Sequence, residues 1–210
     1  MATSTENRTS ILNDLQHKAQ LGAGAYSPVT STEEYFVQPQ APLAEAFKKT
    51  LESISGYCTI MQSESETFAE IAKMCENQTV FCNNPDLTAL LNAHGISHNS
   101  DSEYTRTAKI SITSCEALSA RTASVAVSAA QIKGRRAIAA PETHIVIAYA
   151  SQLCTDLPEV FARLQATYGE NFPSQVTMIT GPSRTADIEK TLVLGAHGPK
   201  KLQVFIIHNQ

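Results

Sequence analysis

The feature that most limits the fold is an alternation of strand-like and helix-like segments that starts at Pro42 and continues to the end of the chain. Short apolar runs predict strands, and longer segments with apolar residues at helical spacing predict helices. Strands that alternate with helices predict an α/β fold, with a mostly parallel central sheet and helices on both faces. The expected helices are residues 42–55, 63–78, 85–95, 157–169 and 185–194. The expected strands are residues 57–61, 79–82, 108–118, 123–129, 144–151, 175–180 and 202–207.

The N-terminal part of the chain has a different pattern. Residues 1–21 contain Ile11, Leu12 and Leu15 at helical spacing, which predicts an N-terminal helix. Gly, Pro, Ser and Thr dominate residues 22–41, which predicts a flexible arm or linker. We therefore expect one α/β domain over residues 42–210. The tethered helix could pack on its own domain or on a neighbouring chain, as in a homo-oligomer.

Composition argues against several functional classes. A net charge of -4 over 210 residues disfavours a nucleic-acid partner, which usually requires a basic face. No apolar run approaches the roughly 20 residues of a membrane helix. The first residues lack the apolar segment of a secretory signal. We therefore expect a cytoplasmic protein without a membrane segment.

The five cysteines are widely spaced, and no C-x-x-C pair occurs. This spacing suggests neither an iron–sulfur cluster nor a zinc site. We expect buried small apolar residues in a reducing compartment, and no cofactor or metal held by this chain.

The segment "TGPSRTADIEKTLVLGAHGP", residues 180–199, is the richest candidate for a site. It follows one expected strand, contains an expected helix and precedes the last strand, so its first turn should lie where ligands collect in α/β sheets. Gly181 permits close approach, and Ser183 and Thr185 offer hydroxyls at a helix N-terminus, which favours an anion. Asp187 and Glu189 in the first turn suit a well-capped helix instead. Both interpretations remain open.

The loop after this expected helix contains two glycines and a histidine. Gly195 suits a left-handed helix cap, and Pro199 prevents the helix from continuing. His197 could act as an acid, a base or an anion donor, or could simply bond a carbonyl. A helix over residues 186–194 would be about 13 Å long, at roughly 1.5 Å per residue. Its two ends could therefore meet one small ligand only if the loop with Gly198 folded back.

Three other positions carry groups that could be functional. Arg135 and Arg136 follow a glycine and could clamp a carboxylate or phosphate, although such a pair is more often a solvated turn. Glu116 could be a basic or nucleophilic carboxylate, or equally a surface acid at a strand end. His144 precedes the most apolar strand, and we expect a structural role for it.

The composite "ITGPSRTADIEKTLVLGAHGPKKLQVFII" resembles a known family, the lactate-utilisation C group (LutC/YkgG), whose domain is named LUD. The segment "RRAIAAPETHIVI" is similar to the family's basic pair, proline and histidine before an apolar strand. The N-terminal "RTSILNDLQHKAQ" fits the family's opening helix.

The resemblance implies the fold of sugar-phosphate isomerases and coenzyme A transferases (NagB/RpiA/CoA transferase-like). It also implies a role in oxidising L-lactate to pyruvate beside iron–sulfur partner proteins, with this chain as the cluster-free subunit or accessory factor. Residues 181–189 and 195–199 would then form two walls of one site for a small anionic ligand. The catalytic candidates are His197, Asp187 and Glu189. The ligand-binding candidates are Thr122, Gly181, Ser183, Thr185, Gly195, Gly198 and Arg135.

The sequence departs from the family at one motif. The family usually carries A-E-T-G-T, whereas residues 120–124 here read A-R-T-A-S. Arg121 thus replaces an acid and Ala123 a glycine. The local charge is reversed, so two alternatives stay open. The chain could be a free-standing enzyme, or a non-catalytic binding module for a carboxylate, a sugar phosphate or an acyl-CoA.

Overall fold

A computed structural model describes residues 41–132, 134–185, 193–195 and 197–208, together with Arg8, Leu12, Asn13 and Pro39. The chain divides into two units, residues 1–37 and 38–210. In the first unit Arg8, Leu12 and Asn13 are helical. The remainder of the expected N-terminal helix, and all of the expected arm except Pro39 and residue 41, lie outside the described residues.

The second unit alternates helices and strands, and short 3-10 helices (η) join some of them. Its helices are α2 Leu43–Ser53, α3 Glu64–Cys75, α4 Pro85–Ala93, η2 Ser102–Arg106, η3 Arg135–Ile138, η4 Ala150–Gln152 and α5 Leu157–Tyr168. Its strands are β1 Tyr57–Met61, β2 Val80–Phe81, β3 Ile110–Thr113, β4 Ala117–Ser119, β5 Ser124–Ser128, β6 Thr143–Tyr149, β7 Leu153–Cys154, β8 Val176–Thr180, β9 Arg184–Thr185, β10 Val193–Leu194 and β11 Lys201–Ile207. No helix in this described part has the length and apolar character that crossing a membrane requires.

Five strands form a parallel central sheet in the order β1-β11-β6-β3-β2. β6 and β11 occupy central positions and are almost entirely apolar, as expected for strands that are covered on both faces. The prediction of an α/β fold with a mostly parallel central sheet is confirmed.

A second sheet has the order β7-β4-β5-β8, in which β5 pairs antiparallel with both β4 and β8. The single strand expected over residues 108–118 is therefore wrong. Its first half is β3 of the central sheet, and its second half is β4 of the second sheet. β8 also belongs to the second sheet, so the expected β-α-β unit that links residues 175–180 to residues 202–207 is wrong as well.

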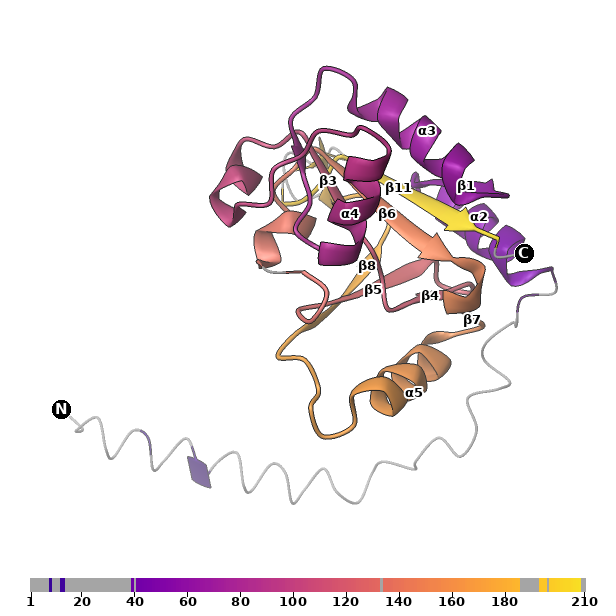
Figure 1. Cartoon of the computed structure of the whole chain (residues 1–210). Helices are drawn as coiled ribbons and strands as arrows, with labels where there is room; N and C mark the ends of the chain where they lie inside the picture. Colours follow the sequence, from indigo (N-terminus) through magenta and orange to yellow (C-terminus); the bar gives the residue numbers. More distant parts are fainter. Residues whose placement is uncertain are drawn as a thin grey trace. The chain divides into compact units, whose positions relative to one another are not determined.

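The elements stack in layers, which Figure 1 shows from the side. α3 and α4 cover one face of the central sheet, where Phe68 and Leu91 pack on Ile145. α2 and the second sheet cover the other face through a core that includes Phe47 and Val125. α5 packs on the far face of the second sheet. Helices thus cover both faces of the central sheet, but the second sheet shares one face with α2.

Side-chain caps define where the helices begin. Ser63 Oγ accepts the N–H of Glu66 at the start of α3, as serine commonly does at the N-cap position. Asn84 and Asp156 cap α4 and α5. The helical spacing of residues 157–169 predicts that Phe161 packs inward beside Val160 and Leu164, but this prediction is wrong, because the Phe161 side chain is 52% exposed. All five cysteines are free and four are buried, as expected.

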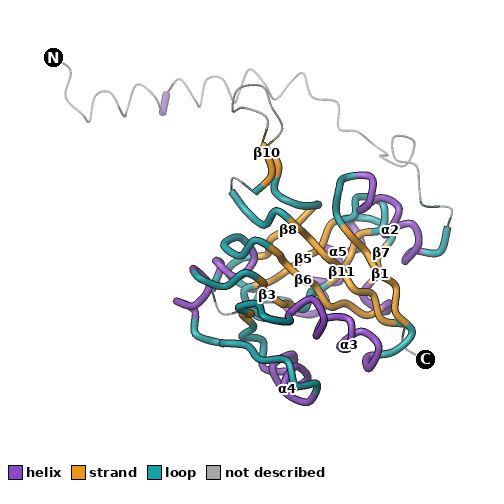
Figure 2. Tube along the Cα trace, turned by 90° about the horizontal axis from the view of Figure 1, so that it is seen from above, coloured by secondary structure: helices purple, strands orange, loops and turns teal. Residues whose placement is uncertain are grey.

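The helix expected over residues 185–194 is wrong at both ends. Thr185 belongs to β9 and pairs antiparallel with Val193 of β10. The pair of short strands lies beyond the end of β8 (Figure 2). Residues 186–192 lie outside the described residues. The pairing of β9 with β10 places Val193 beside Thr185, whereas a helix over residues 185–194 would hold its two ends apart.

Candidate functional site

A connected row of four hydroxyls runs along the β4–β5 turn to the end of β8. Thr122 Oγ1 donates to Ser119 Oγ at 2.8 Å and shares a second 2.8 Å hydrogen bond with Ser124 Oγ. Ser124 Oγ in turn lies 2.7 Å from Thr180 Oγ1. Ser119 and Ser124 are buried, whereas Thr180 is exposed. This hydroxyl row, Ser119, Thr122, Ser124 and Thr180, therefore leads from the core to the surface.

Gly181 continues from the exposed end of the row in a conformation that favours glycine. Its φ is 81°, and an added Cβ would lie 3.1 Å from Ile54 Cδ1 at the end of α2. Both the backbone angle and the contact therefore oppose a side chain here. The turn that begins at Gly181 therefore lies directly against Ile54, which packs on the core.

Ser183 meets the glycine loop, which comprises the described residues of the segment 195–199. The N–H of Ser183 donates to the carbonyl of Pro199 at 2.9 Å, and the N–H of Gly195 donates to the carbonyl of Ser183 at 2.9 Å. A Cβ on Gly198 would lie 3.2 Å from Ser183 Cβ. Because β9 and β10 pair as a ribbon, the two segments expected to be walls of one site lie side by side.

Arg121 forms part of the cap of α5. Its Nε donates to Asp156 Oδ2 at 2.7 Å, and its backbone N–H donates to the carbonyl of Thr155 at 3.1 Å. The other oxygen of Asp156 accepts the N–H of Leu157. Burial acts to raise the pKa of Asp156, but the hydrogen bonds from Arg121 and Leu157 outweigh it and hold the pKa below its ordinary value. The charge of Arg121 is thus matched by the N-cap acid of α5.

Ala123 keeps a glycine-like backbone although it has a side chain. Its φ is 52°, in the left-handed region, and it is fully buried in the β4–β5 turn. The backbone at residue 123 therefore has a conformation that glycine adopts more readily than alanine.

Replacing Ala123 with glycine should change the free energy of unfolding by less than about 1 kcal/mol. Relief of the left-handed conformation favours glycine by roughly 1–2 kcal/mol, whereas the loss of a buried methyl and the greater freedom of glycine in the unfolded chain each oppose it by about 1 kcal/mol. Urea unfolding measures the change. Ala89→Gly within α4 is the control for the freedom of glycine and should destabilise by about 1 kcal/mol. A loss of about 2 kcal/mol in Ala123→Gly, the sum of the two opposing contributions, would show that the turn is not strained.

The remaining predicted site residues are placed as follows. His197 is exposed in the glycine loop next to Gly198, and Thr185 lies in β9. Asp187 and Glu189 lie outside the described residues. Arg135 begins η3, a 3-10 helix, and its neighbour Gly134 lines a separate cavity.

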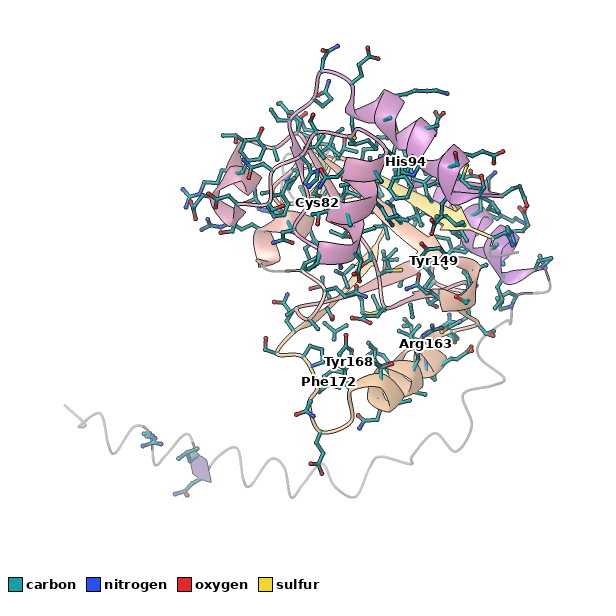
Figure 3. All side chains as sticks on the ribbon, viewed as in Figure 1. Cys82, His94, Tyr149, Arg163, Tyr168 and Phe172 are labelled. Carbon is teal, nitrogen blue, oxygen red and sulfur yellow. The ribbon has the colours of Figure 1, made fainter. Side chains whose placement is uncertain are left out.

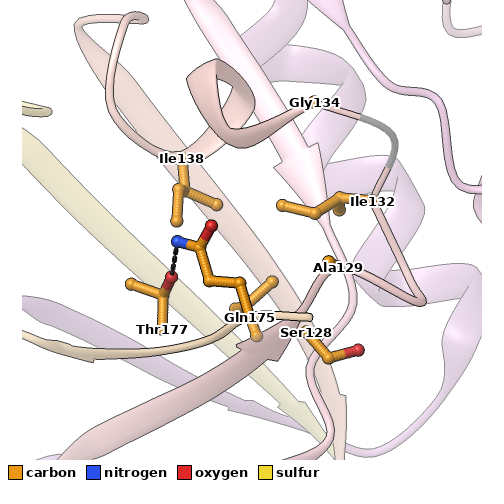
Figure 4. A pocket seen from close by; sticks show the side chains of 8 residues that line it. Ser128, Ala129, Ile132, Gly134, Ile138, Gln175 and Thr177 are labelled. Carbon is orange, nitrogen blue, oxygen red and sulfur yellow. Dashed lines mark hydrogen bonds between the residues drawn. The ribbon is translucent and has the colours of Figure 1, made fainter. Parts of the chain in front are cut away.

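That separate cavity, of about 250 Å³, lies between β5, β8 and the segment that leads into η3 (Figure 4). Its wall is mainly apolar and includes Val127, Ile132 and Ile138. Gln175 extends between these side chains and donates to Thr177 Oγ1 at 2.8 Å. The hydroxyl row is not part of its lining.

Sequence reasoning missed Ser119, Ser124, Thr180 and Asp156. A signal was present for two of them, since Ser119 and Ser124 flank the A-R-T-A turn and directly oppose one another in the β4–β5 pair. Recognising a tight hairpin there would have placed both hydroxyls beside Thr122. Nothing local connects Asp156 to this turn, because their contact depends on the pairing of β4 with β7.

Glu116 accepts hydrogen bonds from two hydroxyls below the second sheet. Tyr168 OH of α5 donates to Glu116 Oε1 at 2.5 Å, and Ser128 Oγ donates to the same oxygen. Burial and the bond to Glu116 raise the pKa of Tyr168. Figure 3 shows Tyr168 near Phe172, whose ring it meets edge-on. The acid therefore ties the end of α5 to the sheet.

Removing the hydroxyl with Tyr168→Phe should destabilise the domain by about 1–2 kcal/mol, since a hydrogen bond to a charged acceptor is lost. Thermal unfolding at neutral pH measures this effect. Tyr57→Phe, at a side chain that is 53% exposed, is the matched control and should have little effect. Equal stability of the two variants would mean that Glu116 does not anchor α5.

His144 is fully buried in β6, and its Nε2 lies 2.8 Å from Thr113 Oγ1. Burial lowers its pKa to about 4. The structural role expected for this histidine is confirmed by its packing. Within the described residues, no group of three or more His, Cys, Asp or Glu side chains is placed to hold a metal ion.

Known proteins resemble this chain in sequence and in fold. The sequence model of the LUD domain matches residues 40–207. Lactate utilization protein C 1 of Bacillus mycoides is 30% identical over 135 residues, which cover 59% of this chain and 58% of the relative. Lactate utilization protein C of Macrococcus caseolyticus is 33% identical over 105 residues, which cover 49% of this chain and 46% of the relative. The chain thus spans about half the length of the curated relatives it matches.

A crystal structure of a DUF162 family protein from Deinococcus radiodurans has the same fold. It superposes with a TM-score of 0.61 at 19% identity and covers 80% of this chain and 99% of its own. At this identity the likeness concerns the fold. The match of the LUD sequence model to most of the α/β unit, together with these relatives, shows that the chain belongs to the LUD domain family.

Proposed function

We propose that this chain is a component of a system that oxidises L-lactate to pyruvate, and that it holds a small carboxylate at the hydroxyl row and glycine loop. The observation that carries the proposal is the 30–33% identity to proteins named lactate utilization protein C. In this proposal the chain supplies the binding site, and iron–sulfur partner proteins supply the electron-transfer groups.

The chemistry of the site suits binding an anion. Thr180 offers an exposed hydroxyl at the end of a hydrogen-bonded row, and it can donate to a carboxylate when the hydroxyls of the row rotate so that Ser124 donates to Thr180. The exposed imidazole of His197 lies in the adjoining glycine loop and could add a donor. Asp156 is a poor candidate for a base, because its oxygens accept hydrogen bonds from Arg121 and Leu157. These groups support binding and orientation of the ligand more than proton abstraction.

Ligand-dependent thermal stabilisation tests the binding step. L-lactate and pyruvate should raise the unfolding temperature in a concentration-dependent way, because a ligand of the native state stabilises it. Thr180→Val should abolish the shift while the protein stays folded. Thr177 lies in the same strand, β8, and does not belong to the hydroxyl row, so Thr177→Val is the control for removing a threonine hydroxyl. A shift with sugar phosphates or acyl-CoA but not with lactate or pyruvate would contradict the proposed ligand.

Affinity purification of the tagged chain from lactate-grown cells of its own host tests the partner step. Iron–sulfur proteins should co-purify, and they should be recognised by their visible absorption and iron content. A preparation that contains the chain alone, from cells that are actively oxidising lactate, would contradict this part of the proposal.

The main alternative is a free-standing enzyme or a binding module for another small anion, such as a sugar phosphate or an acyl-CoA. The observation that favours a module is the pairing of Arg121 with Asp156, which leaves the turn without the family's acid. If the chain is an enzyme that uses His197, His197→Ala should lower turnover far more than stability. A loss of stability alone would exclude that catalytic role.

A further inference from the structure

A second cavity lies at the edge of the central sheet where β2, β3 and β6 end. It has a volume of about 360 Å³, within the range of small-molecule sites. Ligands of parallel α/β sheets bind beyond the carboxyl ends of the strands, and this cavity occupies that position. We term it the edge cavity. It is lined by Asn84, Pro85, Asp86, Leu87, Leu90, Ser114, Cys115, Ala130, Gln131, Ile147, Tyr149 and Gln152.

Three amide side chains hold the frame of the edge cavity in place. Asn84 Oδ1 caps α4, and its Nδ2 donates to Ser114 Oγ at 3.3 Å and to the carbonyl of Gln131 at 3.2 Å. Gln131 Nε2 and Gln152 Nε2 both donate to the carbonyl of Cys115, at 3.2 and 2.5 Å. These bonds join the ends of β2 and β3 to the segments after β5 and β6. The cavity is therefore preformed, since closing it would break them.

The ionisable groups of the edge cavity disfavour an anion. Among the residues that the structure describes, no lysine or arginine lines it. Burial raises the pKa of Cys115, and burial with a hydrogen bond to Glu64 raises the pKa of Tyr149 to about 12, so both are neutral at pH 7. The N-terminus of α4 gives no compensation, because Pro85 has no N–H and Asp86 adds a carboxylate. A neutral ligand suits these surroundings best.

The shape of the lining narrows the ligand further. Leu87, Leu90 and Ile147 provide apolar contacts, and Ser114 Oγ together with the second N–H of the Gln131 and Gln152 amides provides hydrogen-bonding groups. A planar heterocycle matches both parts, because its faces are apolar and its edge carries donors and acceptors. We propose that the edge cavity binds the base of a nucleoside, with Ser114, Gln131 and Gln152 contacting the edge of the base and the apolar side chains contacting its face.

This site is distinct from the carboxylate site proposed above. Its lining comes from α4, from the segments after the central strands and from the segment after β5, and it includes no residue of the hydroxyl row. The two sites also differ in chemistry, since one suits an anion and the other a neutral ring. Binding at the edge cavity can therefore be tested whether or not the chain binds lactate.

Isothermal titration of the full chain with adenosine, guanosine and uridine tests this proposal. At least one nucleoside should bind with a Kd below about 1 mM. Ribose alone should give no signal, and the matching 5′-monophosphate should bind no more than about threefold tighter, because the described lining of the site contains no cation. Failure of all three nucleosides to bind, or binding of ribose 5-phosphate and inorganic phosphate instead, would overturn the proposal.

Two matched substitutions locate the site. Ala130 lines the cavity and is exposed, so Ala130→Phe should fill the cavity without disturbing the core, and should weaken nucleoside binding at least about tenfold. Ala89 is exposed on α4 but does not line the cavity, and Ala89→Phe should leave the affinity unchanged. Unaltered binding to Ala130→Phe, or equal weakening by both variants, would refute the assignment to this cavity.

Discussion

Replacing Asp156 with alanine is expected to lower the free energy of unfolding by about 2–3 kcal/mol, because two interactions end at this carboxylate. Loss of the N-cap of α5 costs about 1 kcal/mol. Loss of the charge-assisted hydrogen bond to Arg121, whose side chain is only 24% exposed, adds about 1–2 kcal/mol. Urea unfolding at pH 7 measures the total.

The pH dependence of the stability difference between the wild type and Asp156→Ala, together with two further variants, separates the contribution of the cap from that of the charged pair. The pKa of Asp156 is lowered in the folded state, so its contribution is complete above the ordinary pKa of aspartate and is lost as the pH falls through the lowered value. Asp156→Asn should keep most of the cap and lose only the charged pair. Arg121→Met should lose the pair and keep the cap. A change of less than about 0.5 kcal/mol in Asp156→Ala would contradict this description of the turn.

Acidification from pH 6.5 to pH 4 is expected to remove about 3 kcal/mol of stability through His144 alone. The pKa of His144 falls from 6.5 to about 4 because the side chain is buried. The unfolded chain therefore binds a proton on this residue between pH 6.5 and pH 4, whereas the folded chain does not. Since the unfolded state binds more protons in that interval, stability falls as the pH falls. Unfolding midpoints measured across the interval give the slope.

His144→Gln is the control for this slope. A glutamine can keep the hydrogen bond to Thr113 but cannot take up a proton, so the variant should be less stable at pH 7 and much less sensitive to pH. An unchanged slope in His144→Gln would assign the acid sensitivity to other groups, and would contradict a neutral His144 in the core.

The apolar periodicity of the sequence was sufficient to predict that the central sheet is parallel and covered by helices. β6 and β11 are apolar runs that admit few other environments. α2, α3, α4 and α5 carry apolar faces, and α3, α4 and α5 also carry capping residues at their N-termini. The second sheet could not be predicted in the same way. Its strands β4 and β7 have only three and two residues, so pairing between distant segments, and not local pattern, defines them.

The segment 185–194 shows where local pattern misleads. Its composition suits a helix, yet Arg184 and Thr185 pair with Val193 and Leu194 as strands. With this pairing, the N–H of Ser183 donates to the carbonyl of Pro199, and the carbonyl of Ser183 accepts the N–H of Gly195. These backbone groups therefore have partners across the β9–β10 pair. The proximity of Ser183 to Gly198 was anticipated from motifs of the family, whereas the hydroxyl row required knowledge of the strand register.

The role in lactate oxidation is tested most directly in the organism that carries the gene. Deleting the gene should abolish consumption of L-lactate as the carbon source, and a wild-type copy should restore it. A Gly198→Val copy should not, because a side chain at this position would crowd Ser183, whereas an Ala89→Val copy at an exposed position should. Consumption of L-lactate at the wild-type rate in the deletion strain would contradict the proposed function.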